Sequence, residues 1–202
     1  MDDQSATLHP PVNKGREAMG YLTYIIDHYN VLPDINLFLH PHRDGWPVAW
    51  HNDANGYDNA ESARNLKLDY VRTHGYANMR CIAIPGCPDE VQILRDDPER
   101  THERAYKQAY KFMFQVSDDS VPQVVGTPCC SQFAVSKARI LMRPLSDYQR
   151  YRQWLIDTEL TSDVSGRVLE YMWHIIFGKN AVWCPNLHEC WCEQFGRCEG
   201  RR

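Results

Sequence analysis

The feature that most constrains the fold is a cluster of cysteines near the C-terminal end of the chain. Cys184, Cys190, Cys192 and Cys198 have the spacing C-x5-C-x-C-x5-C. Four thiolates in so short a segment can surround a zinc ion tetrahedrally. Alternatively, these four and the other four of the eight cysteines can form disulfides, and spacing alone does not select the pairing. The third alternative is free thiols. With zinc or disulfides, residues 184–202 form a cross-linked knot that packs on an α/β domain of residues 1–183.

The composition indicates one globular domain with no obvious affinity for membranes. Of the 202 residues, 43% are hydrophobic and 24% are charged, which is enough apolar surface to bury a core. No apolar run approaches the roughly 18 residues that a membrane helix needs. The polar first residues do not resemble a signal peptide, so we predict a cytoplasmic protein, a setting that favours zinc over disulfides. The net charge of −4 restricts any RNA contact to a local basic patch.

Helical and strand-like patterns alternate along the chain. Apolar residues recur at helical spacing over residues 15–29, and Pro33 prevents this helix from continuing. Further helices are predicted at residues 99–116, 146–158 and 165–177, and strands at residues 35–40, 77–84 and 131–136. The alternation predicts a single layered α/β domain with a small mixed sheet flanked by helices.

The loop after the first predicted strand concentrates side chains that can do chemistry. It carries His40, His42, His51 and Asp53. Ligands of open α/β sheets bind beyond the carboxyl ends of strands, where imidazoles and carboxylates can hold a divalent metal or move protons. The alternative is a solvated loop whose histidines are satisfied by backbone groups.

The last predicted helix carries a polar stripe. Arg167, Glu170 and His174 are three or four residues apart and therefore share one face. If the cysteine cluster covers this face, Glu170 requires a cationic partner, either Arg167 or a ligand. The alternative is an ordinary solvated helix face.

Other reaction classes find little support. The chain has no glycine-rich phosphate loop and no G-x-S-x-G sequence. Cys129 and Cys130 form an adjacent pair before the third predicted strand, and such a pair can be buried and inert or nucleophilic.

Several segments, in order along nearly the whole chain, resemble a fungal family of long-uncharacterised proteins. They are NKGREAMGYLTYIIDHYNVLPDINLFLHPHR from Asn13, GYANMRCIAIPGCP from Gly75, CCSQFAVSKARI from Cys129, SGRVLEYMWHIIFG from Ser165, and the cysteine-rich tail. The resembled family includes the fungal arginine-containing cyclodipeptide synthases, which join two aminoacyl-tRNAs into a cyclic dipeptide. It is also distantly similar to A-type glycosyltransferases, which implies a glycosyltransferase-A-like or Rossmann-like core.

The resemblance implies a tRNA-dependent aminoacyltransferase that joins arginine, from arginyl-tRNA, to a second amino acid. Such a reaction needs no cofactor for the chemistry, so zinc would be structural. It requires a pocket, a base for the attacking amine and donors for the oxyanion. We assign catalytic roles to Glu170, His40, His51 and Arg167, and substrate binding to His42, Asp53, Arg80, Asp163 and His174.

The sequence departs from the synthases in one motif and leaves two alternatives open. The DD-x-x-E motif of the synthases is altered, because Glu99 follows Asp96 and Asp97 one place early. A metal-dependent glycosyltransferase-like enzyme predicts a nucleotide cleft with paired carboxylates. A non-catalytic relative predicts that Glu170, His40 and His51 lie scattered, whereas a synthase predicts an acid-lined pocket beside basic residues.

Overall fold

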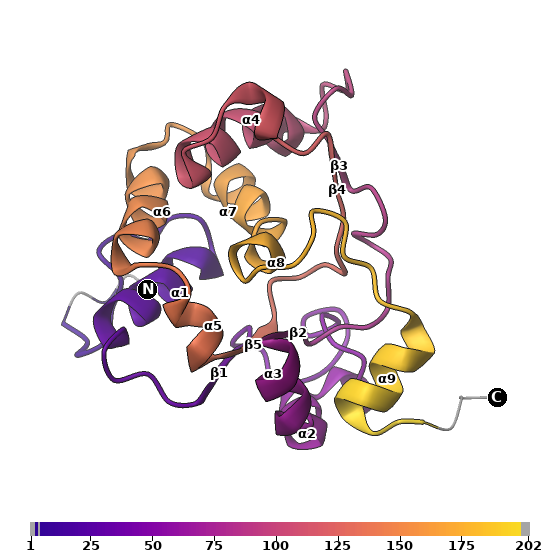
Figure 1. Ribbon diagram of the computed structural model, residues 1–202. Helices are drawn as coiled ribbons and strands as arrows, with labels where there is room; N and C mark the ends of the chain where they lie inside the picture. Colours follow the sequence, from indigo (N-terminus) through magenta and orange to yellow (C-terminus); the bar gives the residue numbers. More distant parts are fainter. Residues whose placement is uncertain (1–2, 4, 199–202) are drawn as a thin grey trace.

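The computed structural model describes residue 3 and residues 5–198 (Figure 1). Its helices are α1 (Glu17–His28), α2 (Asn59–Asn65), α3 (Leu68–His74), α4 (Thr101–Phe114), α5 (Lys137–Leu141), α6 (Leu145–Asp157), α7 (Ser162–Glu170), α8 (Trp173–Ile176) and α9 (Leu187–Phe195), with short 3-10 turns at Asn55–Tyr57 and Asp118–Ser120. Its strands are β1 (Ile35–Phe38), β2 (Tyr76–Asn78), β3 (Val91–Gln92), β4 (Val124–Val125) and β5 (Phe133–Ser136). The predicted α/β class is confirmed.

The main sheet has three strands in the order β1-β5-β2, and both pairs are antiparallel. Strands β3 and β4 form a separate antiparallel pair. The prediction of a mixed sheet is therefore wrong, because the paired strands are antiparallel. Among the described residues, a parallel pairing occurs in the isolated bridge between Gly126 and Val182. A Rossmann-like core is built on parallel strands with crossover helices, an arrangement that this antiparallel sheet does not share.

The second strand is much shorter than the predicted 77–84. Its continuation is prevented because the backbone N–H groups from Arg80 onward are bound by side chains: Asn78 accepts from Arg80, and the carboxylate of Asp53 accepts from Cys81 and Ile82. A strand needs these donors for its ladder. The polar loop after β1 thus ends β2.

Hydrophobic residues cover both faces of the central strand β5, whose four residues are all buried. Phe133 and Val135 belong to a large core cluster with α1, α4, α6, α7 and α8, whereas Ala134 belongs to a smaller cluster with α3 and α9. This division follows from the alternation of side chains along a strand. Figure 1 accordingly shows α4, α6 and α7 on one side of the sheet and α2, α3 and α9 on the other.

The predicted helix 165–177 is two helices. Thr161 caps the first by accepting a hydrogen bond from the N–H of Val164, so α7 begins earlier than expected. It ends at Glu170, where Tyr171 leaves helical geometry and its carbonyl accepts a hydrogen bond from the buried Tyr106 hydroxyl. The break directs α8, and with it His174, away from the polar stripe of α7.

All eight cysteines are paired in disulfides, which corrects the zinc prediction. Cys184 and Cys190 bond to cysteines outside the predicted cluster, and Cys192 and Cys198 bond to each other, so these four sulfurs do not form one ligand set. The pairs are Cys81–Cys190, Cys87–Cys184, Cys129–Cys130 and Cys192–Cys198.

The tail is a helix anchored by these bonds. Cys190 and Phe195 of α9 are buried in the smaller cluster, while residues 199–202 of the predicted tail lie outside the described residues. Disulfides persist in oxidising compartments, so the cross-links do not favour the predicted cytoplasmic location, which stays a prediction. No helix in the described ranges is long and apolar enough to cross a membrane.

Candidate functional site

A pocket of about 400 Å³ lies where α1, α4 and α7 meet the loop after β1 and the chain before β5. Each of these elements contributes side chains that can bind or react. The lining residues that bear on function are Arg16, Glu17, His40, Trp50, His51, His102, Cys129, Cys130, Asp163, Arg167 and Glu170. The structure therefore brings together all four predicted catalytic residues.

Two glutamates form the acidic part of the pocket. Glu17 is the first residue of α1 and Glu170 is the last residue of α7. The two helices approach closely because Gly166 of α7 packs against the backbone of Gly15, where a Cβ would lie 3.1 Å from the carbonyl oxygen. The absence of a side chain at position 166 relieves this tight contact and favours the close approach, which sets both carboxylates in one pocket.

Burial raises the pKa of both glutamates. For Glu170 the loss of water is the largest cause, and the negative charge of Glu17 raises its pKa further. Arg167 and the backbone N–H of Cys130 oppose this shift. The position of Glu170 at the negative end of a helix also disfavours its charge. The pocket is thus a place where a bound cation would be stabilised.

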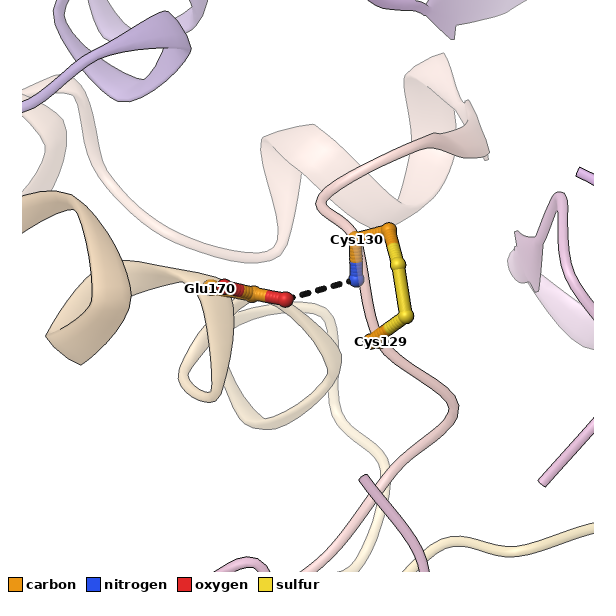
Figure 2. A group of neighbouring side chains, drawn as sticks. All are labelled: Cys129, Cys130 and Glu170. Atoms are coloured by element: carbon orange, nitrogen blue, oxygen red, sulfur yellow. Dashed lines mark hydrogen bonds between the residues drawn. A yellow bond between two sulfur atoms is a disulfide. The ribbon is translucent and has the colours of Figure 1, made fainter. Parts of the chain in front are cut away.

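Glu170 is held in a fixed orientation (Figure 2). Its Oε1 accepts a 2.8 Å hydrogen bond from the backbone N–H of Cys130. Its Oε2 lies 3.4 Å from one terminal guanidinium nitrogen of Arg167, and the other terminal nitrogen of Arg167 lies 3.9 Å from a carboxylate oxygen of Glu90. The longer contacts of Arg167, and its half-exposed side chain, leave it free to contact a ligand as well.

His40 and His51 stand beside the carboxylates. Their ring centres are 4.6 Å apart, and Nε2 of His40 is 4.0 Å from Glu17 Oε2. The side chain of Gln132 holds both segments, since its oxygen accepts from the His40 N–H and its nitrogen donates to the His51 carbonyl. Gln132 precedes β5, so the central strand sets the position of both histidines.

The histidines of the pocket are uncharged at neutral pH. Burial, followed by nearby positive groups, lowers the pKa of His40, His51 and His102 to about 4. Nε2 of His40, Nδ1 of His51 and Nε2 of His102 have no hydrogen-bond partner within the described part of the chain. Buried polar atoms without a protein partner are suited to form hydrogen bonds with a bound ligand.

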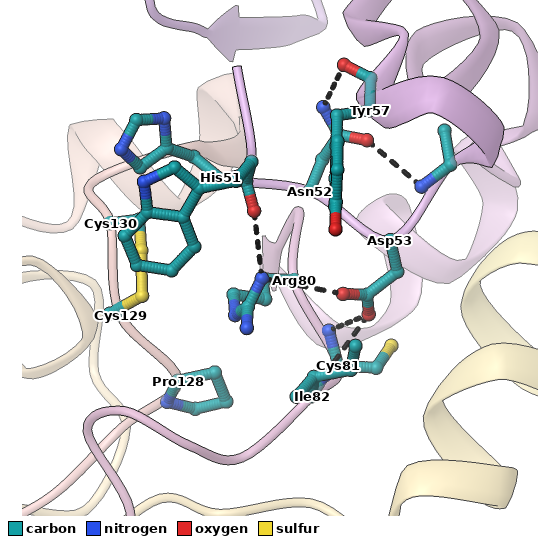
Figure 3. Close-up of polar contacts among 12 residues, drawn as sticks. His51, Asn52, Asp53, Tyr57, Arg80, Cys81, Ile82, Pro128, Cys129 and Cys130 are labelled. Carbon is teal, nitrogen blue, oxygen red and sulfur yellow. Dashed lines mark hydrogen bonds and ion pairs between the residues drawn. A yellow bond between two sulfur atoms is a disulfide. The ribbon is translucent and has the colours of Figure 1, made fainter. Parts of the chain in front are cut away.

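Asp53 and Arg80, predicted to bind substrate, brace the loop instead (Figure 3). The Asp53 carboxylate accepts from two backbone N–H groups and from the indole of Trp191, and it lies 3.8 Å from Arg80. Arg80 donates to the carbonyls of Trp50 and Ile84 and stacks on the Trp50 ring. Both residues are buried and neither lines the pocket. Their role in the structure is to fix Trp50 and His51 in the wall.

The other three predicted substrate-binding residues have different positions. His42 is exposed and outside the pocket. Asp163 lines the rim and pairs with Arg16 at 2.8 Å. His174 is fully buried in the core, with its ring 3.0 Å from the Ala181 carbonyl, because the α7–α8 break turns it inward.

Sequence reasoning missed Glu17 and His102. Both lie on buried helix stripes: Glu17 is four residues before Tyr21, and His102 is four residues before Tyr106. A charged or titratable side chain that continues an apolar stripe is the signal that would have identified them.

A family model described as "Protein of unknown function (DUF3431)" matches residues 1–193, a range that contains every lining residue of the pocket. No curated protein and no solved structure matches the chain.

Proposed function

The chain belongs to the DUF3431 family of proteins of unknown function, and we propose that it is a tRNA-dependent arginine-containing cyclodipeptide synthase. The reaction is suggested by the resemblance of its sequence segments to those synthases. The structural observation that carries the proposal is the pair of partly buried carboxylates, Glu17 and Glu170, in one pocket with unprotonated histidines.

The carboxylate pair is suited to an arginine substrate. Two partly buried carboxylates in one pocket are both stabilised by a cation that binds beside them. A guanidinium donates two parallel hydrogen bonds to a carboxylate, a geometry that a point charge does not match. The arginyl side chain or the amino group of a substrate supplies the missing positive charge.

The histidines are suited to the transfer step. In each acyl transfer the amine nitrogen of one aminoacyl group attacks the ester carbonyl of the other, a C–N bond forms, and the ester C–O bond breaks. The attacking amine loses a proton, and the tRNA hydroxyl leaves with one. His40 and His51 are neutral at pH 7 and can carry that proton. Arg167 can stabilise the oxyanion.

The rim of the pocket supports contact with the terminal phosphates of tRNA. Arg16 and Arg167 line it, and their side chains are 59% and 44% exposed. With a net charge of −4, the protein would make such a contact through this local pair and not through a basic domain.

The two alternatives receive less support. A non-catalytic relative predicts scattered site residues, and Glu170, His40 and His51 line one pocket. A metal-dependent glycosyltransferase would use the polar loop after β1 to hold its cation, and the Asp53 carboxylate of that loop is taken up by backbone and indole donors.

The test is incubation with charged tRNAs, including arginyl-tRNA, followed by mass spectrometry for cyclic dipeptides. Arginine-containing product is expected, with a loss of about 100-fold or more in Glu170→Gln, since a preorganised charge in an acyl-transfer site contributes on this order. The matched control is Glu159→Gln, an exposed glutamate outside the pocket. Absence of product from every pair of tRNAs with folded protein would reject the proposal. Full activity of Glu170→Gln would remove Glu170 from the mechanism.

A further inference from the structure

The disulfide between Cys129 and Cys130 differs from the others in what it can do for the fold. Cys81–Cys190 and Cys87–Cys184 join residues separated by 109 and 97 positions, whereas Cys129 and Cys130 are adjacent. A disulfide stabilises mainly by closing a loop in the unfolded chain. A bond between neighbours closes almost no loop, so stabilisation does not account for it.

The backbone around this pair is held in an uncommon conformation. Cys130 and Ser131 have φ of 97° and 50°, two consecutive residues with side chains in the left-handed region. Such residues cluster at functional sites, where the surroundings impose the conformation. Here it directs the N–H of Cys130 at Glu170, and Figure 2 shows the disulfide beside that carboxylate.

Reduction of the Cys129–Cys130 disulfide would free two thiolates beside the Glu170 carboxylate. The two sulfurs and a carboxylate oxygen all lie within 4.8 Å of one another. Thiolates select thiophilic cations such as zinc, and a carboxylate completes mixed sites of this type. All three residues line the pocket, which leaves a further coordination position for water or a ligand.

We propose that the reduced Cys129–Cys130 pair and Glu170 form a binding site for a thiophilic divalent cation of the zinc class. The site exists in the dithiol state, and the disulfide state closes it by joining two of the ligand atoms. The proposal goes beyond the reaction assigned to the pocket and does not depend on it.

The redox step requires a dithiol reductant. One reductant thiolate attacks a sulfur of the pair, the S–S bond breaks and a mixed disulfide forms. The second reductant thiol then displaces the remaining cysteine. The reductant gives two electrons and becomes a disulfide, and the two cysteines take up two protons. Metal binding releases these protons as the thiolates coordinate. The bound cation then holds Glu170 and withdraws it from ligand binding in the pocket.

The experiment is a cadmium titration of the full chain, followed by ultraviolet sulfur-to-cadmium charge-transfer absorption. Protein is first treated with a limiting dithiol, and alkylation with peptide mapping identifies the open pair. We expect one equivalent of cadmium to bind after reduction and none to bind to the oxidised protein. The Cys129→Ser/Cys130→Ser variant is expected to lose binding. The matched control, Cys192→Ser/Cys198→Ser, removes a disulfide outside the pocket and should retain binding.

Glu170→Gln should bind cadmium at least about 10-fold more weakly, because loss of a ligand weakens binding no less than loss of a group that only orients a ligand. Cadmium binding by Cys129→Ser/Cys130→Ser, or by the oxidised protein, that equals binding by the reduced wild-type protein would overturn the site. Unchanged affinity in Glu170→Gln would remove the carboxylate from it. Opening of Cys81–Cys190 or Cys87–Cys184 before Cys129–Cys130, or loss of the far-ultraviolet circular dichroism spectrum on reduction, would also refute the proposal. Because cadmium binding is measured without substrate, these outcomes are independent of the synthase assay.

Discussion

The two long-range disulfides are expected to stabilise the fold cooperatively. Cys87–Cys184 lies inside the loop closed by Cys81–Cys190, and their sequence separations, 97 and 109, differ by 12. While one bond is intact, the other closes an additional loop of only these few residues in the unfolded chain. Removing either pair alone should therefore lower the free energy of unfolding by about 3 kcal/mol, the loop-closure entropy expected for a loop of this size.

Removing both pairs opens the whole loop. The second removal adds the loop-closure entropy for a loop of about 100 residues, about 4.7 kcal/mol. The total loss in the free energy of unfolding is therefore about 8 kcal/mol. The sum of the two single losses is only about 6 kcal/mol. The excess of about 2 kcal/mol is a coupling that independent cross-links would not show.

The assay is urea unfolding of the protein with Cys81→Ala/Cys190→Ala, with Cys87→Ala/Cys184→Ala, and with all four substitutions. Free energies of unfolding come from far-ultraviolet circular dichroism, without reductant. A four-substitution variant that is unfolded in water, while each pair variant is folded, agrees with the prediction. Strictly additive losses, or a single pair whose removal costs as much as removing both, would refute the nested-loop reasoning.

Three further predictions concern pH and one glycine. Burial lowers the pKa of His174 to about 4 from about 6.5. The neutral ring therefore contributes about 3 kcal/mol to the free energy of unfolding above pH 6.5, and this contribution is lost as the pH falls toward 4. Urea unfolding midpoints that do not fall between pH 7, 5.5 and 4.5 would contradict this. If His40 and His51 carry protons in the reaction, the acid limb of the plot of kcat/KM against pH lies near pH 4. An inflection near pH 6.5 would contradict a role for histidines whose pKa is lowered by burial. Gly86→Ala should lower Tm far more than Gly45→Ala: both residues have positive φ, but an added Cβ at Gly86 collides with neighbouring backbone and at Gly45 meets nothing within 4 Å. Equal Tm losses would show that the close approach at Gly86 does not matter.

Much of the fold could be predicted from the periodicity of apolar residues. Over residues 15–29, 99–116 and 146–158 the pattern identified α1, α4 and α6, since each helix buries one continuous stripe. The pattern failed where non-local contacts decide the backbone. The α7–α8 break coincides with a hydrogen bond from Tyr106, and β2 ends because Asp53 captures its backbone donors. Neither partner is adjacent in sequence.

The sequence predicted only part of the site, because contacts between distant residues decide the rest. Glu170, Arg167, His40 and His51 were identified from local chemistry, and they line the pocket. Asp53 and Arg80 have equally suggestive chemistry, but which groups they contact depends on how the loop folds back on Cys81. Local sequence does not contain that information. The disulfide pairing depends in the same way on contacts between residues about 100 positions apart.

Isothermal titration with argininamide measures whether Glu17 and Glu170 form a receptor for a guanidinium group. We expect the wild-type protein and Glu159→Gln to bind argininamide, with binding at least tenfold weaker in Glu170→Gln. Citrullinamide, which has the same shape without the side-chain charge, should bind the wild-type protein at least tenfold more weakly than argininamide. Equal binding of the two amides, or no effect of Glu170→Gln, would contradict the account.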